Sequence, residues 1–162
     1  MTVATTPQPA EPLGELKLHR LLVAVDGSEN AELALKAAIT AAHRDNAALT
    51  LLTIGPDLST GPAAWSATLG GQLDQEGVDR DLCRQLSEIV ARIPDDIPVT
   101  KLYRRGKPGP EIVKAAKEGN YDAIVLGARG VGRVGAMMGS VSHYVLHHAG
   151  IAVFVAHAPR EG

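Results

Sequence analysis

Five short strand-like runs alternate along this chain with segments that carry apolar residues at helical spacing. The runs occupy residues 21–25, 49–54, 99–103, 121–126 and 151–156, and the third is more polar than the others, which is consistent with an edge strand. The first run is wholly apolar, which is typical of a strand buried on both faces of a sheet. Each intervening segment is long enough to carry the chain back to a neighbouring parallel strand by a right-handed crossover. The alternation predicts one doubly wound α/β sheet of five parallel strands, with helices on both faces.

The length of 162 residues suits one domain. Residues 1–17 are rich in Thr and Pro and show no helical or strand periodicity, so we expect them to form a disordered tail. Residues 18–158 then form the folded domain. Aromatic residues make up only 3% of the chain, so its core must consist mainly of Ala, Val, Leu and Ile.

Charge and cysteine content exclude several classes of protein. A net charge of −2 provides no electrostatic footprint for nucleic acid or an anionic membrane. The single cysteine, Cys83, cannot form an internal disulfide, and no Cys/His spacing suits zinc. The N-terminus lacks the pattern of a signal peptide, and no apolar run approaches the ~18 residues of a membrane span. We therefore expect a cytoplasmic protein that has neither nucleic acid nor membrane as a partner.

The stretch between Gly127 and Val141 is a candidate anion site. It reads GARGVGRVGAMMGSV, follows an apolar run and precedes a predicted helix that has Ser140 in its first turn. Glycines allow the backbone to approach a ligand closely, and unpaired N–H groups at the start of a helix attract phosphate. A surface loop, with Ser140 acting only as an N-cap, is the simpler alternative.

A second candidate lies where the first apolar run ends in Asp26-Gly27-Ser28. Ligands of doubly wound sheets bind beyond the carboxyl ends of the strands, at the point where strand order reverses. If the first and fourth strands are neighbours there, Asp26 and the stretch from Gly127 face one cleft. Asp26 can accept from a ribose hydroxyl or help to hold Mg²⁺, although it is also a common turn former.

Three segments of the chain, LLVAVDGSENAELALKAA, RRGKPGPEIVKAAKEGNYDAIVLGARG and GSVSHYVLHHAGIAVFVA, resemble the universal stress protein family. Together they cover roughly residues 19–157. The resemblance implies a strand order of three-two-one-four-five. It also implies a homodimer formed partly through the last strand, at residues 151–156.

The nucleotide-binding branch of that family carries a G-x2-G-x9-G-(S/T) motif that holds the phosphates of ATP. Gly127 and Gly130 match its first half, and Gly139-Ser140 match its second half, but eight residues separate the two halves here instead of nine. The resemblance also implies that Asp26 lies at the mouth of the nucleoside pocket and that Leu49 lies where the second strand would meet adenine. The resulting set of cofactor-binding residues is Val25, Asp26, Leu49, Gly127, Arg129, Gly130, Gly139, Ser140 and Val141.

These residues favour a regulatory, ATP-binding stress-response protein that uses ATP together with Mg²⁺ and hydrolyses it slowly at most. No nucleophile and base occur at a spacing that suggests dedicated catalysis. The eight-residue spacing keeps open a second function, a dimeric interaction protein of the same fold that does not bind nucleotide.

Two further features have simpler explanations. Trp65 lies in a long loop at residues 55–72, where it can close over a ligand or, more simply, anchor the loop. His143 and His147 are four residues apart, as two metal ligands would be, but no third ligand completes a set.

Overall fold

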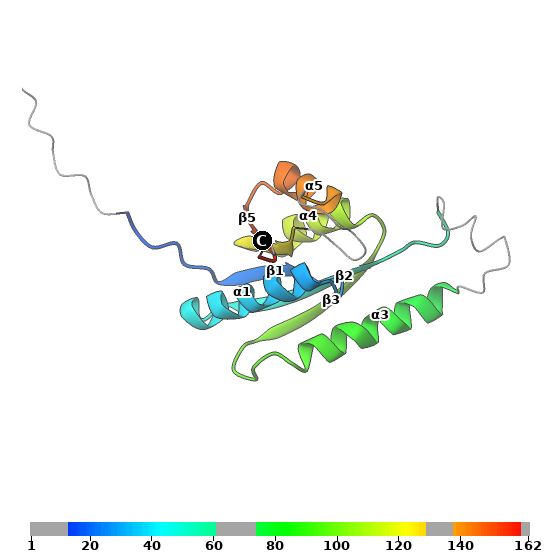
Figure 1. The fold of residues 1–162 in the computed structure, drawn as a ribbon, viewed down its shortest axis with the longest axis horizontal. Helices are drawn as coiled ribbons and strands as arrows, with labels where there is room; N and C mark the ends of the chain where they lie inside the picture. The colour runs from blue at the N-terminus through cyan, green and yellow to red at the C-terminus, as the bar shows by residue number, and fades with distance from the viewer. Residues whose placement is uncertain (1–12, 61–73, 129–137, 160–162) are drawn as a thin grey trace, which may run out of the picture.

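The computed structural model describes residues 13–60, 74–128 and 138–159. Within these residues the chain forms a five-stranded sheet whose strands all run parallel, in the order β3-β2-β1-β4-β5 (Figure 1). The strands are β1 (Arg20–Ala24), β2 (Ala48–Gly55), β3 (Val99–Arg105), β4 (Ala123–Gly127) and β5 (Ala152–Ala156). This order confirms the predicted fold, including the edge position expected for the polar third strand. The prediction for Trp65 falls outside the described residues.

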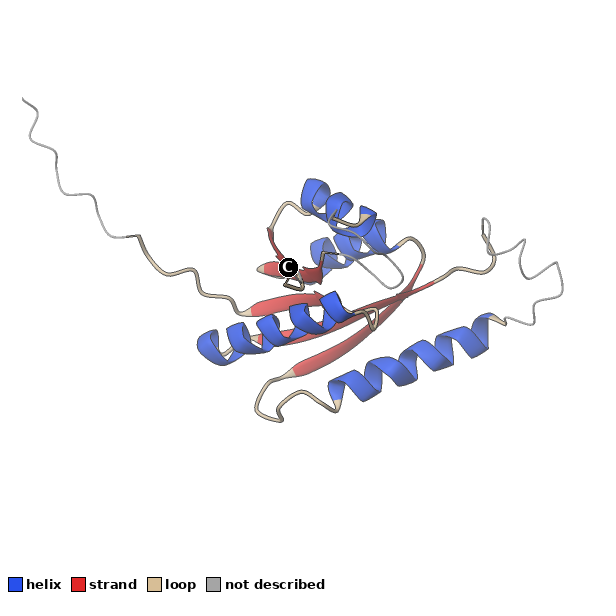
Figure 2. Cartoon of the chain, viewed as in Figure 1, coloured by secondary structure: helices blue, strands red, loops and turns tan. Residues whose placement is uncertain are grey.

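Helices cover both faces of the sheet (Figure 2). The helices are α1 (Glu29–Asp45), α3 (Gln75–Val90), α4 (Pro108–Gly119) and α5 (Ser140–His148). Side chains of α1 and α3 pack with one face of the strands into a core that includes Ala34, Leu51 and Leu86. Side chains of α4 and α5 pack with the other face around Leu22 and Ile124. None of the helices within the described residues is long and apolar enough to span a membrane.

Helix α1 lies close to the sheet because its buried face is built from small residues. Ala34, Ala38 and Ala42 are each 2% exposed or less. Ser28 is the N-cap, and its side chain accepts a hydrogen bond from the Ala31 amide at 3.2 Å. The small stripe and the cap together place the first turn of α1 directly against the carboxyl end of β4.

Helix α4 ends at Gly119, and helix α5 begins at Ser140. Asn120, the C-cap of α4, adopts a left-handed conformation with φ 49°. The ring of Tyr121 occupies the space that a Cβ on Gly119 would need, so glycine suits this position. The N-cap of α5 is Gly139, and Ser140 is already the first helical residue. The alternative explanation of Ser140 as an N-cap is therefore wrong.

Asp122 joins β1 to β4 at the amino ends of the strands, opposite the predicted ligand edge. Its Oδ2 accepts hydrogen bonds from the amides of His19 at 2.6 Å and Arg20 at 2.8 Å. These hydrogen bonds, mainly the one from Arg20, lower the pKa of Asp122 below its ordinary value of 3.8. Because the folded state prefers the ionised carboxyl, this contribution to stability is present at neutral pH and is lost as the pH falls through the lowered pKa.

We therefore expect Asp122→Asn to lower the free energy of unfolding at pH 7. The difference from wild type should shrink progressively below the ordinary pKa of 3.8, because the wild-type carboxyl then becomes protonated as well. Urea unfolding at pH 7, 5 and 3 measures it. A difference that stays constant over this range would show that the charge of Asp122 does not stabilise the junction of β1 and β4.

Candidate functional site

A cleft opens at the carboxyl ends of the central strands, where the strand order reverses between β1 and β4. It encloses an empty volume of about 550 Å³, part of which is open to solvent. Its lining residues come from β1, β2, β4, α1, α4 and α5: Ala24, Val25, Asp26, Ser28, Ala31, Leu52, Ile54, Pro108, Ile112, Leu126, Gly127 and Val141. Small-molecule sites in α/β sheets form at this position.

The walls of this switch-point cleft are largely apolar, with one charged side chain at the rim. Leu52, Ile112 and Leu126 provide aliphatic surface, and Asp26 is the only charged residue in the part of the lining that the structure describes. An apolar cavity with a few polar groups suits a flat ring system that carries a polar substituent. The arrangement therefore fits a nucleoside better than a small, fully charged ligand.

Asp26 is positioned by the turn that links β1 to α1. Its Oδ1 accepts a hydrogen bond from the Ser28 amide at 2.9 Å, and the side chain is exposed to solvent. Gly27 completes the turn with a φ of 78°. Asp26 is thus a turn former and also lines the cleft, so its two predicted roles do not exclude each other.

Val25 ties the end of β1 to β2. Its amide donates to the Leu52 carbonyl at 2.9 Å, and its own carbonyl accepts from Thr53 Oγ1 at 3.1 Å. These bonds continue the pairing of the two strands up to the cleft. Val25 is 5% exposed and lines the cleft, as predicted.

Gly127 forms the point where β4 meets α1. A Cβ at this position would lie 2.6 Å from the carbonyl carbon of Asn30 and 2.8 Å from the Ala31 amide nitrogen. Real Cβ atoms do not approach backbone atoms so closely, so this site requires glycine. Gly127 therefore matters for the close packing of helix and strand as well as for the cleft that it lines.

Ser142 links the residues at the two ends of the glycine-rich segment, a role that the sequence did not reveal. It is 1% exposed, and its hydroxyl donates to the Ala128 carbonyl at 2.7 Å and lies 3.1 Å from the Gly139 carbonyl. The Gly139 amide also donates to the Ala128 carbonyl, at 2.7 Å. Ala128 and Gly139 are thereby held together on either side of residues 129–138. The Gly139 amide is consequently bonded within the protein.

The structure brings together four of the predicted site residues: Val25, Asp26, Gly127 and Val141 all line the switch-point cleft. Ser140 lines an adjoining cleft between the first turns of α4 and α5. Arg129 and Gly130 lie outside the described residues.

Leu49 does not line the cleft. It is the second residue of β2, pairs with Leu21, and is 1% exposed in the core beneath α1. At ~3.3 Å per residue, five residues separate it by roughly 16 Å along the strand from Ile54, which does line the cleft. The carboxyl-end rule, applied within β2 itself, would have selected Leu52 and Ile54 instead.

Comparison with known proteins identifies the family of this chain. The family model described as "Universal stress protein family" matches residues 17–157. The chain belongs to the universal stress protein family. The universal stress protein YxiE of Bacillus subtilis is 31% identical over 138 residues, which cover 78% of this chain and 90% of that protein.

Solved structures of universal stress proteins share the architecture. The universal stress protein UspA from Lactobacillus plantarum superposes with a TM-score of 0.70 at 30% identity, covering 88% of this chain and all of that one. Two more distant structures match at TM-scores of 0.66 and 0.64, with 20% and 24% identity. They cover 89% and 88% of this chain and 100% of their own. The first is a universal stress protein in complex with cyclic AMP, and the second is one from Archaeoglobus fulgidus in complex with dAMP.

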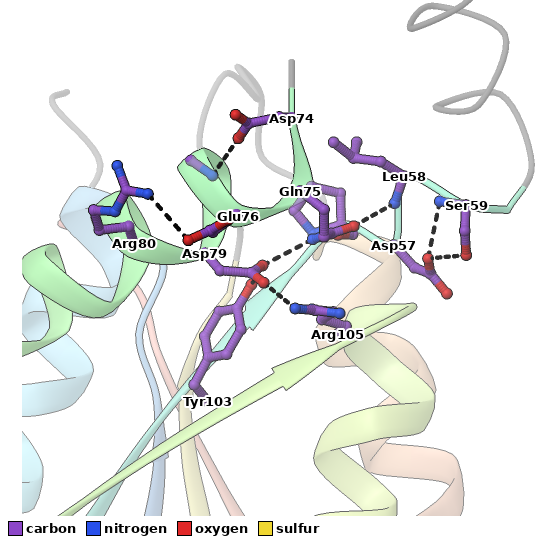
Figure 3. A network of polar contacts seen from close by, with 12 residues as sticks. Asp57, Leu58, Ser59, Asp74, Gln75, Glu76, Asp79, Arg80, Tyr103 and Arg105 are labelled. Carbon is purple, nitrogen blue, oxygen red and sulfur yellow. Dashed lines mark hydrogen bonds and ion pairs between the residues drawn. The ribbon is translucent and has the colours of Figure 1, made fainter.

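In this universal stress protein a cluster of polar side chains beside the cleft holds the ends of β2 and β3 against α3 (Figure 3). Asp79 accepts hydrogen bonds from the Tyr103 hydroxyl at 2.5 Å and from Gln75 Nε2 at 2.8 Å, and it pairs with Arg105. Gln75 Oε1 also accepts from the Leu58 amide at 2.8 Å. The residues on either side of 61–73 are therefore held to each other.

Burial, followed by the carboxylate of Asp79, raises the pKa of Tyr103 to about 12. The hydrogen bond from Tyr103 is the main cause that lowers the pKa of Asp79. The pair is thus fixed as a neutral phenol and an ionised carboxyl near neutral pH. This cluster stabilises the fold beside the site and does not line the switch-point cleft.

No group of three or more His, Cys, Asp or Glu side chains is placed to hold a metal ion within the described ranges. His143 and His147 contact each other edge to face, with ring centroids 4.6 Å apart, on an exposed part of α5. A divalent cation at the cleft would therefore need ligand oxygens in addition to the Asp26 carboxylate.

Proposed function

We propose that this universal stress protein is a regulatory protein that binds an adenine nucleotide, ATP together with Mg²⁺, in the switch-point cleft. The observation that carries the proposal is the apolar cleft at the reversal of strand order, with Asp26 at its rim. The complexes of two structural neighbours with cyclic AMP and dAMP support an adenine nucleotide as the ligand class.

The lining divides into parts that suit each portion of such a ligand. Leu52, Ile54 and Ile112 offer apolar surface to the adenine ring, and Asp26 can accept from a ribose hydroxyl. Gly127 allows close approach of the ligand to the end of β4. Leu49, which lies in the core, has no part in the proposed site.

Mg²⁺ fits this site only as a companion of the phosphates. Proteins usually hold Mg²⁺ through one or two carboxylates together with substrate phosphates and water. Asp26 is the one carboxylate in the described lining that could take part. When bound, the ion would neutralise phosphate charge, while Asp26 orients the nucleotide from the rim of the cleft.

The proposed role is regulatory because the lining offers little for chemistry. Among its described residues only Asp26 is ionisable, so no pair of groups can supply both an acid and a base. We therefore propose hydrolysis that is slow at most, and a conformational or assembly response as the output of binding.

The proposal includes a homodimer formed through β5 and a cytoplasmic location. Within the described chain, β5 pairs with β4 on one side only, and Phe154 on this strand is 44% exposed. An unpaired strand edge with an exposed aromatic side chain is suited to pairing with a second copy. Sedimentation equilibrium of the purified protein distinguishes a dimer from a monomer.

A dimeric interaction protein that has lost nucleotide binding remains the second candidate. The eight-residue spacing between Gly130 and Gly139 favours it, because the phosphate motif of the family has nine. Heating the purified protein and analysing the supernatant by chromatography separates the two functions. Released ATP or ADP is expected under the proposal, whereas protein free of nucleotide that also binds none when supplied would support the second function.

We expect Asp26→Asn to weaken binding of both AMP and ATP by about 3- to 10-fold, the loss typical of one charge-assisted hydrogen bond to a sugar hydroxyl. The amide oxygen of asparagine can still accept from the Ser28 amide, so the turn and the melting temperature should be preserved. Calorimetric titration measures the affinities. Unchanged affinity would show that Asp26 serves only the turn.

A further inference from the structure

A second cleft adjoins the proposed nucleotide site between the first turns of α4 and α5. Its lining consists of Lys107, Pro108, Gly109, Pro110, Ser140, Val141 and Tyr144. It has an empty volume of about 400 Å³, including open solvent, and shares Pro108 and Val141 with the switch-point cleft. A ligand that fills the first cleft can therefore extend past Val141 into the second.

The two clefts differ in the charge of their linings. Among the described residues that line the switch-point cleft, Asp26 is the one charged residue, and it is acidic. Among those that line the second cleft, Lys107 is the one charged residue, and it is basic; the hydroxyl-bearing Ser140 lines the same cleft. Lys107 would attract the phosphates of a nucleotide, whereas Asp26 would approach them only through Mg²⁺, so electrostatics favours an orientation with the terminal phosphates in the second cleft.

We propose that Lys107 binds the terminal phosphates of the nucleotide and thereby makes the site selective for ATP over AMP. This inference rests on the proposed function. It adds that one residue, Lys107, lets the site distinguish nucleotides by their number of phosphates. AMP would fill the first cleft and leave the second largely empty, whereas the β- and γ-phosphates of ATP would reach Lys107.

Lys107 is available for this role because its ammonium group forms no ion pair with the described residues. It precedes the first turn of α4 and makes no side-chain capping bond. The nearby Arg104 pairs with Glu111 and Glu118, and Arg105 pairs with Asp79. No ion pair involves Lys107 in the part of the chain that the structure describes, so of these three neighbouring cations it is the one that can bind a ligand without breaking an existing bond.

The width of the second cleft is set by a close contact between its two helices. A Cβ on Gly109 would lie 2.9 Å from Cδ1 of Tyr144, so the start of α4 rests against this ring. Gly109 is buried in this contact. Lys107, Ser140 and Tyr144 therefore line one cleft between helices that are in direct contact.

The test compares Lys107→Gln with Lys117→Gln. Lys117 is exposed on the same helix and lines neither cleft, and both variants change the net charge equally. Calorimetric titration with MgATP, ADP and AMP measures each affinity. We expect Lys107→Gln to weaken ATP by about 5- to 10-fold and AMP by less than about twofold, as for one lost charge-assisted phosphate contact. Lys117→Gln should bind all three as wild type does.

Salt dependence provides a second readout. Raising the ionic strength from about 0.05 to 0.5 M should weaken ATP binding more in wild type than in Lys107→Gln, because the variant lacks the screened interaction. Equal losses for ATP and AMP, or no selective loss of ATP, would refute the role of Lys107 while leaving nucleotide binding intact. Failure of wild type to bind any of the three nucleotides would instead refute the proposed function, and this inference with it.

Discussion

Replacing Gly127 with Ala is expected to lower the free energy of unfolding by about 3 kcal/mol, near the upper range for overpacking in a well-packed site. The added methyl would lie 2.6 Å from the carbonyl carbon of Asn30 and 2.8 Å from the Ala31 amide nitrogen. Both are backbone atoms of α1 and cannot rotate away, so the helix or the strand must shift. For a domain of this size the corresponding fall in melting temperature is roughly 10 °C.

Gly14→Ala is the matched control, because a Cβ at Gly14 meets no atom within 4 Å. Its stability should equal that of wild type within about 0.5 kcal/mol. Urea unfolding followed by circular dichroism measures all three proteins. A Gly127→Ala variant as stable as the control would show that α1 and β4 are not in close contact, and that Gly127 is retained for the ligand alone.

Ser142→Ala is expected to cost about 1.5 kcal/mol, because it removes a hydroxyl that is 1% exposed and donates to the Ala128 carbonyl at 2.7 Å. The melting temperature should fall by about 5 °C. Ala128 and Gly139 would then be held together by the Gly139 amide alone. We expect ATP affinity to fall roughly 10-fold, since the start of α5 is no longer fixed against the end of β4.

Ser140→Ala separates the effect on stability from the effect on binding. The Ser140 side chain is exposed, makes no hydrogen bond to the described residues and lines the second cleft. Its removal should leave thermal stability unchanged while weakening ATP. If Ser142→Ala and Ser140→Ala were equally stable, the buried Ser142 hydroxyl would not be holding Ala128 and Gly139 together.

The sheet could be predicted because each strand carries its own signal. Leu21–Val25 and Ala123–Leu126 are wholly apolar, as strands covered on both faces must be, and the small stripe of α1 predicts close packing. The strand order followed from the family resemblance and is confirmed. Asn46, a residue type that favours turns, ends α1 in a left-handed conformation with φ 55°.

Parts of the site depend on contacts that one-dimensional patterns do not encode. Ser142 follows the recognised Gly139-Ser140 pair by two residues, and only the bend of the chain back to Ala128 shows its role. Lys107 is far from the glycine-rich segment in sequence but shares a cleft with Ser140. Leu49 was placed by analogy with the second strand of the family, whereas the cleft takes Leu52 and Ile54 from the other end of that strand.

Calorimetric titration of nucleotide-free wild-type protein with ATP in the presence of Mg²⁺ tests nucleotide binding most directly. Parallel titrations with AMP and cyclic AMP show how strongly the β- and γ-phosphates of ATP contribute to its affinity. We predict saturable binding of one ATP per chain, tighter than that of AMP and weakened by Asp26→Asn. The absence of detectable binding up to millimolar MgATP would contradict the account and leave the β5 edge as the functional surface of the protein.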